Sequence, residues 1–294
     1  MHGRAFNRQE DIRKLQIFLA EMRNQGTQAG TFRFGDLMYE MHHPFTGFEE
    51  EADIRIWGSD EGGISGFVFF RPPDNPEFFI RPELYGSRME DEMLSWTLTR
   101  AKERSLESIE TSCLDTDAAK AAFLRRRGFT EGDEVCVLME RSLAEPLPAY
   151  RLPDGYSVVT IAERPELACW ASYSPDWSMS REAYRHLQSA PGYKADMDVR
   201  AFYHDTELAS ECICWYDDVN NCGQFQPLRT QGEHRRKGLG SAVMTRAMEN
   251  LRRYGADRVF VWTGKQNIGA VRFYQKLGFN ITNEDYAWKR SIVE

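Results

Sequence analysis

The 294-residue sequence has no long apolar run and no metal-binding arrangement of cysteines. No stretch approaches the roughly 20 apolar residues that cross a lipid bilayer, and the first ten residues lack the apolar segment of a signal peptide. The six cysteines are scattered, and no cluster of cysteine and histidine has zinc-ligand spacing. We therefore expect a cytoplasmic protein with reduced thiols that meets no membrane and holds no metal.

Basic residues are also in short supply. The chain has 37 Lys and Arg against 45 Asp and Glu, which gives a net charge of -8. A general nucleic-acid binder needs a basic face to neutralise phosphates, so the composition argues against that class. It is compatible with a cationic substrate, although many cytoplasmic proteins without such a substrate are equally acidic.

Two segments of the sequence end alike. Residues 117–129 and 267–279 both close on Gly-Phe, and Phe279 follows Phe129 by 150 residues. Each segment predicts a short helix, because cations suit the negative end of a helix and glycine takes the left-handed conformation that ends it. The surroundings match as well, with long helices predicted over 89–104 and 239–254, strands over 108–113 and 258–263, and final strands over 135–139 and 285–288. The chain therefore contains two copies of one α/β unit.

A proline-rich segment separates the two copies. Residues 144–153 hold three prolines and show no helical periodicity, which is typical of a linker. We predict a first domain over 1–145, a linker over 146–153 and a second domain over 154–294. The predicted fold class is α/β (α+β, with a mixed sheet), in two tandem domains of the same kind.

The second copy contains a basic, glycine-rich turn at the junction of a strand and a helix. Arg235, Arg236 and Lys237 precede Gly238-Leu239-Gly240, and a helix with apolar residues at spacings of four follows. Glycines let backbone N–H groups approach a ligand, and the helix N-terminus adds positive potential. The order of residues fits neither a Walker loop nor a dinucleotide fingerprint. A tight turn alone would explain the glycines, but three adjacent cations favour a pyrophosphate site.

The motif Arg235-x-x-Gly238-x-Gly240 resembles the acyl-CoA signature of the GNAT N-acetyltransferase superfamily. Asn267, Ala270, Phe273-Tyr274 and Gly278-Phe279 resemble that superfamily's next block. The resemblance covers about 154–294, with the first half as a degraded copy, and the whole is similar to bacterial tandem-GNAT proteins. It implies acetyl-CoA as the acyl donor. The residues that it assigns to acetyl-CoA are Leu228, Arg229, Thr230, Arg235, Arg236, Lys237, Gly238, Leu239, Gly240, Ser241 and Asn267.

The resemblance also assigns the catalytic role to Tyr274, as the acid that protonates the departing CoA thiolate. The nucleophile would be the amine of a small-molecule substrate, so the protein needs only a way to deprotonate an ammonium. Three carboxylates on or beside the strand before Leu228 are candidates for that base, namely Glu211, Asp217 and Asp218. The sequence does not show whether any of these carboxylates is the base or whether all three are solvated turn residues. The amides of Gln224 and Gln226 cannot act as bases.

The first copy departs from the signature at the residues that matter. Its junction has Gly86 but no Gly-x-Gly, and three acidic residues at 90–92 open the following helix and would repel a pyrophosphate. Leu124 stands where the second copy has Tyr274. We expect this half not to bind acetyl-CoA productively and instead to form one wall of the acceptor pocket.

Alternatives stay open at this level. The chain is also compatible with a non-catalytic acyl-CoA-binding module, with a transferase that takes aminoacyl groups from tRNA, and with an acetyltransferase that acts on a protein or peptide amine. The retained Tyr274 disfavours the first and the acidic balance disfavours the second. His42-His43 has no partner at metal-ligand spacing. The aromatic residues of segment 166–193 could grip a cationic amine or simply pack in the core, and they are Trp170, Tyr173, Trp177 and Tyr184. The sequence does not define the oligomeric state.

Overall fold

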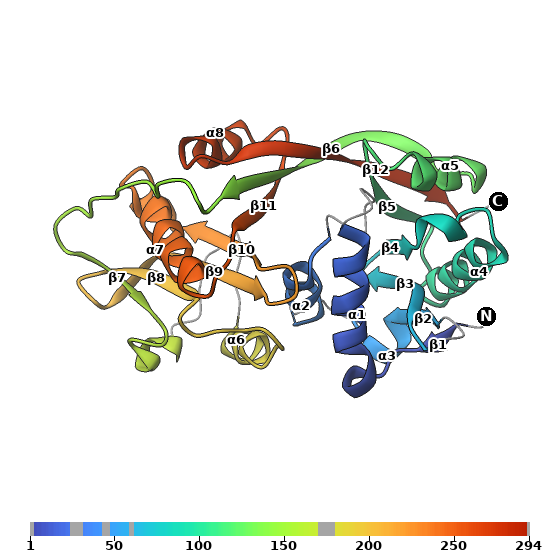
Figure 1. The fold of residues 1–294 in the computed structure, drawn as a ribbon, viewed down its shortest axis with the longest axis horizontal. Helices are drawn as coiled ribbons and strands as arrows, with labels where there is room; N and C mark the ends of the chain where they lie inside the picture. The colour runs from blue at the N-terminus through green and yellow to red at the C-terminus, as the bar shows by residue number, and fades with distance from the viewer. Residues whose placement is uncertain (1–2, 24–31, 43–47, 59–61, 170–179, 293–294) are drawn as a thin grey trace.

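The computed structural model describes residues 3–23, 32–42, 48–58, 62–169 and 180–292. Helices and strands alternate in two lobes that are joined across one side by long strands (Figure 1). The larger sheet is mixed, because one of its strand pairs is parallel and the others are antiparallel. The predicted α/β fold class is therefore confirmed.

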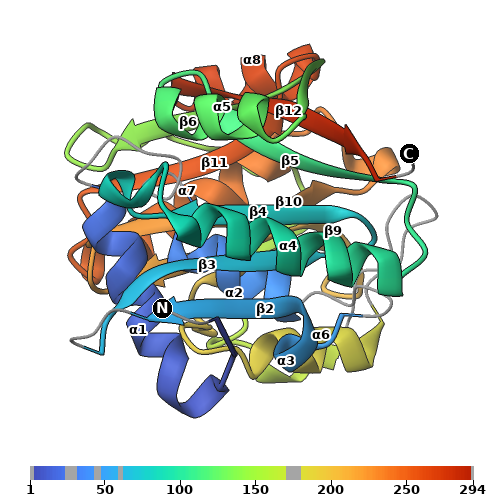
Figure 2. The ribbon, with the colours of Figure 1, turned by 90° about the vertical axis from the view of Figure 1, so that its right-hand side faces the viewer.

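The first half builds a four-stranded antiparallel sheet in the order β1-β2-β3-β4. Helix α4 lies across these strands (Figure 2) and packs on β3. The bounds of its elements are β1 Arg4–Ala5, α1 Arg8–Arg23, α2 Phe34–His42, α3 Glu50–Asp53, β2 Ile54–Gly58, β3 Ile64–Arg71, β4 Asn75–Ile80, α4 Arg88–Glu103, β5 Ser108–Leu114, α5 Ala118–Arg126 and β6 Thr130–Ser142.

The second half repeats the pattern after a segment, 143–155, that has no helix or strand. Its helix α7 packs against β8, β9 and β10 through an apolar face. The bounds are β7 Tyr156–Thr160, α6 Arg181–Gln188, β8 Asp198–Tyr203, β9 Glu207–Asp217, β10 Cys222–Thr230, α7 Leu239–Arg253, β11 Arg258–Gly264, α8 Ile268–Lys276 and β12 Asn280–Ser291.

The predicted internal repeat is present in the structure. Strands β5 and β11, and helices α5 and α8, have bounds that differ by the same 150 residues. Asp117 and Asn267 cap the equivalent helices by accepting a hydrogen bond from the backbone N–H three residues later. Gly128 and Gly278 end these helices with positive φ values of 77° and 82°, as their sequence positions predicted.

The last strand of each copy pairs with the other copy. The eight-stranded sheet has the order β5-β12-β6-β11-β10-β9-β8-β7, so β12 of the second half lies between β5 and β6 of the first. Strand β6 in turn pairs with β11, from Cys136 opposite Gly264 to Ser142 opposite Arg258. Both strands extend beyond their predicted bounds and span the two lobes (Figure 1). The division at 146–153 remains a prediction, since the chain on its two sides shares one sheet.

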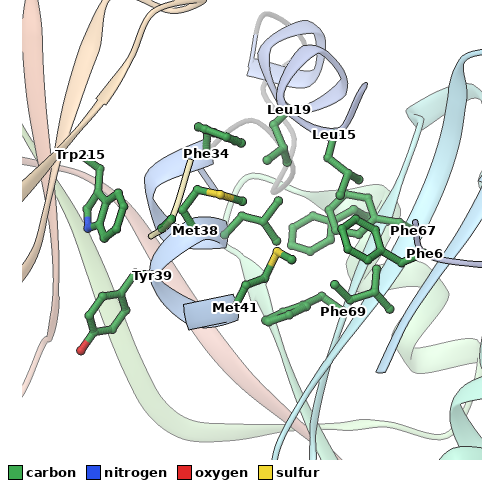
Figure 3. Close-up of a cluster of buried hydrophobic side chains, with 14 of the residues drawn as sticks. Phe6, Leu15, Leu19, Phe34, Met38, Tyr39, Met41, Phe67, Phe69 and Trp215 are labelled. Carbon is green, nitrogen blue, oxygen red and sulfur yellow. The ribbon is translucent and has the colours of Figure 1, made fainter. Parts of the chain in front are cut away.

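Helix α2 joins the two lobes through their interior. All nine of its residues are buried, which is expected of a helix that packs on both sides. Figure 3 shows its side chains between α1 and β3 on one side and Trp215 of β9 on the other. The helix also contacts β10. The first half therefore supplies a helix that faces the sheet of the second.

Among the described residues, every helix is too short or too polar to cross a lipid bilayer. The same residues contain no group of three or more His, Cys, Asp or Glu side chains arranged to hold a metal ion.

Candidate active site

The predicted cofactor strand, β10, separates from its neighbour midway. Strands β10 and β11 pair in parallel from Cys222 opposite Arg258 to Phe225 opposite Val261, and no further. Strand β10 continues to Thr230 while paired only with β9, after a register shift between Phe225 and Leu228. Beyond Phe225, therefore, no strand of the described residues pairs with the edge of β10 that faces β11. Unpaired backbone N–H and C=O groups of this kind can form hydrogen bonds with the amides of an extended ligand.

The basic loop after β10 leads into a helix whose N-terminus is open. Gly238 is the N-cap of α7 with φ 82°, a conformation that favours glycine, and no side chain caps the helix. The first N–H groups of α7 are thus available to an anion. A Cβ atom on Gly238 would meet only the Arg151 carbonyl oxygen, at 4.0 Å, so the space in front of the turn is open. At Gly240 a Cβ atom would lie 3.2 Å from Phe273 Cζ, which explains the second glycine by close packing.

A chain of hydrogen bonds that the sequence did not reveal fixes this loop. The buried His234 ring contacts Tyr156 Oη at 2.8 Å through Nδ1 and Glu207 Oε1 at 2.9 Å through Nε2. Lys237 Nζ donates to the same Tyr156 hydroxyl at 2.8 Å. Arg235 folds back on β10, with Nε donating to the Thr230 carbonyl at 3.2 Å. The loop is therefore tied to β7, β9 and β10. The residue spacing in the sequence predicts the loop, but it does not predict these hydrogen-bond partners.

Tyr274 lies on the inner face of α8, with 7% of its surface exposed. Its ring packs against Phe273 and Phe279. Burial, with a smaller effect from the nearby Cys212 thiol, raises the pKa of Tyr274 to about 12. The phenol is therefore protonated at neutral pH, as a proton donor must be.

Asn267, the other predicted residue of this motif, has a structural task. Its Oδ1 accepts a hydrogen bond from the Ala270 N–H at 3.1 Å and so begins α8. Contact between its side chain and CoA stays a prediction, as do the cofactor contacts of Leu228–Thr230 and Arg235–Ser241.

The three carboxylates considered as bases differ in their surroundings. Asp217 holds the β9–β10 turn by accepting from Asn220 Nδ2 at 2.7 Å, and it also accepts from Gln16 Nε2 at 3.0 Å. Asp218 pairs with Arg13 at 3.1 Å. Glu211 lies opposite Arg229 on β9 and β10, with its Oε1 3.7 Å from Arg229 Nη2. All three therefore have partners within the protein.

A cavity of about 320 Å³ lies between the halves, next to the point where β10 and β11 part. Gln226 and Trp262, the first residues beyond the last pair of these strands, line it. The rest of the lining comes mostly from the first half and from β12. It includes six acidic side chains, which are Asp36, Glu40, Glu77, Glu110, Glu134 and Asp285. Burial is the main reason that the pKa of Asp36 and that of Asp285 are both raised to about 7.

The equivalent loop in the first half is already filled by a carboxylate. The buried Glu90 accepts a hydrogen bond from the Gly86 N–H at 2.5 Å and pairs with Arg126 at 3.0 Å. Ser87 caps α4 with its side chain, and Leu124 is fully buried where the second half has Tyr274. This half therefore supplies its own anion at the position where the other half leaves the helix N-terminus open.

The other histidines and aromatic residues singled out in the sequence either have a structural role or lie outside the described residues. His42 is buried and its Nδ1 lies 2.7 Å from the Met38 carbonyl oxygen, a contact within α2. Tyr184 is buried and hydrogen-bonds Asp198. The other candidates, His43, Trp170, Tyr173 and Trp177, lie outside the described residues.

Comparisons with known proteins point to the same family as the motifs of the second half. The acetyltransferase (GNAT) family matches residues 166–279. The mycothiol acetyltransferase of Thermobispora bispora is 23% identical over 81% of this chain and 83% of its own length. The one of Geodermatophilus obscurus is 26% identical over 60% of this chain and 61% of its own length. A solved tandem GNAT protein from the clavulanic acid biosynthesis pathway has a TM-score of 0.70 at 15% identity, covering 100% of this chain and 99% of that one.

The protein is thus an acetyltransferase, and its residues 166–279 match the GNAT family that its motifs resembled. More particularly, it has the tandem arrangement of two GNAT-like units, with the family match in the second unit.

Proposed function

We propose that the protein transfers an acetyl group from acetyl-CoA to the amine of a small molecule, at one site in its second half. The observation that carries the proposal is the open N-terminus of α7 beside the unpaired edge of β10. The residues around this site fit a pyrophosphate followed by an extended arm: Gly238 leaves open space, the helix N–H groups are uncapped, and β10 offers backbone groups.

In the proposed reaction the amine attacks the thioester carbonyl directly. A nitrogen–carbon bond forms and the carbon–sulfur bond breaks. The nitrogen loses one proton to solvent, the departing thiolate takes a proton from Tyr274, and Tyr274 regains its proton from solvent. The buried phenol carries its proton at neutral pH, so it has one to donate to the thiolate. The first half contributes no second acetyl-CoA site, since Glu90 occupies its loop.

The name shared by the two relatives supports a small-molecule acceptor over a protein amine. We place the reaction in the cytoplasm and leave the oligomeric state open. The test is a thiol-release assay with acetyl-CoA across polyamines, aminoglycosides, amino acids and peptide N-termini. Release with a small-molecule amine supports the proposal. Turnover confined to peptides, or acetyl-CoA binding without turnover on any amine, would favour the alternatives of a peptide acetyltransferase or a non-catalytic binding module.

A further inference from the structure

The cavity between the halves has far more acidic than basic side chains. Six carboxyl groups line it, against the single guanidinium of Arg71. A second cation, the buried Lys120, lies behind the lining and pairs with Glu77 at 3.4 Å. Glu40 and Glu77 thus face these two cations, and acidic side chains outnumber basic ones among the described residues of the lining.

The inner end of the cavity has hydrogen-bond acceptors without donors. Glu40 Oε1 accepts from Gln226 Nε2 at 3.2 Å and lies 3.4 Å from Arg71 Nη1. Glu40 Oε2 and Gln226 Oε1 are both buried and have no hydrogen-bond partner among the described residues. Glu40 is only 7% exposed. Buried acceptors of this kind are costly unless a ligand supplies the missing N–H groups.

These two acceptors lie where the thioester is expected. Gln226 is the first residue of β10 beyond its pairing with β11, and Glu40 reaches it from α2. An ammonium group has three N–H donors and a positive charge, so it matches a carboxylate and an amide oxygen side by side.

The outer end of the cavity carries a second negative site. Glu110 of β5 and Glu134 of β6 both line the cavity, and Glu134 is exposed. Neither makes a salt bridge with a described residue, and Lys289, which lies opposite Glu110 on β12, lowers the pKa of Glu110 by less than Glu134 raises it. Burial, followed by the charge of Glu134, raises the pKa of Glu110, so these two groups repel each other. A cation at this end would relieve that repulsion.

Building on the proposed function, we infer that the acceptor is an amine with a second cationic group. Its reacting ammonium lies between Glu40 and Gln226, and its other cation lies between Glu110 and Glu134. A cavity of about 320 Å³ is at the lower end of the range for small-ligand sites, which suits a compact diamine.

The first experiment compares putrescine with butylamine, which has the same carbon chain and one ammonium fewer. We expect kcat/KM to be higher for putrescine by about tenfold or more, mainly through KM, which corresponds to one moderately strong ion pair. Added salt should reduce this preference, because part of the site is exposed. Equal kcat/KM values for the two amines would overturn the inference.

The second experiment removes each end of the site. The double variant Glu110→Gln, Glu134→Gln should lose the preference, so that its kcat/KM for putrescine falls to its value for butylamine. The variant Glu107→Gln, Glu131→Gln is the matched control, because it removes the same charge from exposed residues outside the cavity. A preference that survives in the first variant, or disappears in the control, contradicts the assignment.

Glu40→Gln should lower kcat for both amines while acetyl-CoA affinity, measured by calorimetry, stays at the parent value. Parent-like kcat values would remove Glu40 from the inner site.

Calorimetric titrations of the protein, one with putrescine and one with butylamine, separate this inference from the proposed function. Putrescine binding without thiol release keeps the cation site and rejects the function. Release from both amines with equal efficiency keeps the function and rejects the cation site.

Discussion

At the scale of single residues, Tyr274 and Leu124 occupy equivalent places in the two halves, but only Tyr274 has a proton to donate. Tyr274→Phe removes the hydroxyl and keeps the ring that packs on Phe273 and Phe279. We expect kcat to fall by roughly 10²–10⁴-fold, the usual contribution of a positioned acid. Acetyl-CoA affinity should change little, because the loop before α7 is untouched.

The measurement is steady-state kinetics on the best amine of the panel, with acetyl-CoA affinity measured separately. Tyr150→Phe is the matched control, since Tyr150 is 37% exposed and lies outside the site. A loss that appears only in KM would indicate uniform binding instead. A Tyr274→Phe enzyme with parent-like kcat would remove Tyr274 from the reaction.

Asp36 gives a residue-scale prediction for stability against pH. Burial raises its pKa from 3.8 to about 7, although the Arg33 backbone N–H and a hydrogen bond from Trp262 act in the opposite direction. The folded state thus holds this proton at pH values where the unfolded state has lost it. The stability that Asp36 contributes is complete below its ordinary pKa and is lost as pH rises toward 7. The slope is at most about 1.4 kcal/mol per pH unit.

Asp36→Asn should therefore flatten the fall in unfolding free energy over this pH range, as measured by denaturant titration at several pH values. Some slope should persist, because Asp285 has its pKa raised in the same direction. Asp218→Asn is the control. Its pKa is lowered, since hydrogen bonds from Gln16 and Arg13 outweigh desolvation, so its removal should not reduce the slope. An unchanged slope in Asp36→Asn would show that Asp36 ionises normally.

The site residues that the sequence predicted are those with a local signature. The spacing of Gly238 and Gly240 identifies them in the sequence. In the structure Gly238 forms an open left-handed turn, and Gly240 allows a close approach to Phe273. Glu40 and the Tyr156–His234 pair could not be found in this way. Each of these residues makes hydrogen bonds to a loop or strand that is distant in the sequence, and no motif in the surrounding sequence identifies it.

At the scale of elements, α7 is the helix that we propose binds acetyl-CoA, and a glycine lies at each of its ends. Gly238 and Gly255 have φ values of 82° and 86°, and each faces open space. Gly238→Glu adds bulk and negative charge where a pyrophosphate would approach, so acetyl-CoA binding should be abolished. Gly255→Glu carries similar backbone strain at the opposite end of the helix and should bind normally.

Calorimetric titration measures both affinity and stoichiometry. The parent should bind one acetyl-CoA per chain, because Glu90 fills the loop of the first half. Two equivalent sites, or binding that survives Gly238→Glu, would contradict the assignment of the loop.

Most helices and strands could be predicted because their signals are local. The long helices predicted at 89–104 and 239–254 are observed as Arg88–Glu103 and Leu239–Arg253, since apolar periodicity extends along both. The final strands were predicted too short. Their outer parts are polar, and they are held in the sheet by pairing with the other copy, which local propensity does not register.

At the scale of the whole molecule, the exchange of β6 and β12 was invisible in the sequence. The two copies have the same order of elements, so each last strand can pair within its own copy or with the other. Which arrangement forms depends on the linker and on packing between the halves. The exchange makes one continuous sheet of the two copies and brings Asp285 of β12 to the wall of a cavity formed mostly by the first half. A repeat thus predicts the units but not their connection.

This exchange can be tested with cysteines. In the structure Cys113 of β5 pairs with Tyr286 of β12, and opposite residues on antiparallel strands have Cα atoms about 4.5–5.5 Å apart, within the range of a disulfide. Tyr286→Cys should therefore form a disulfide with Cys113 under oxidising conditions, as detected by mass spectrometry of proteolytic peptides. Without exchange, β6 would take the place of β12 beside β5. By the 150-residue repeat, Cys136 would then stand opposite Cys113. The parent chain would form a 113–136 disulfide, and the new cysteine at 286 would not reach Cys113. Recovery of a 113–136 link would show that each half keeps its own last strand, and the shared sheet would then have to be abandoned.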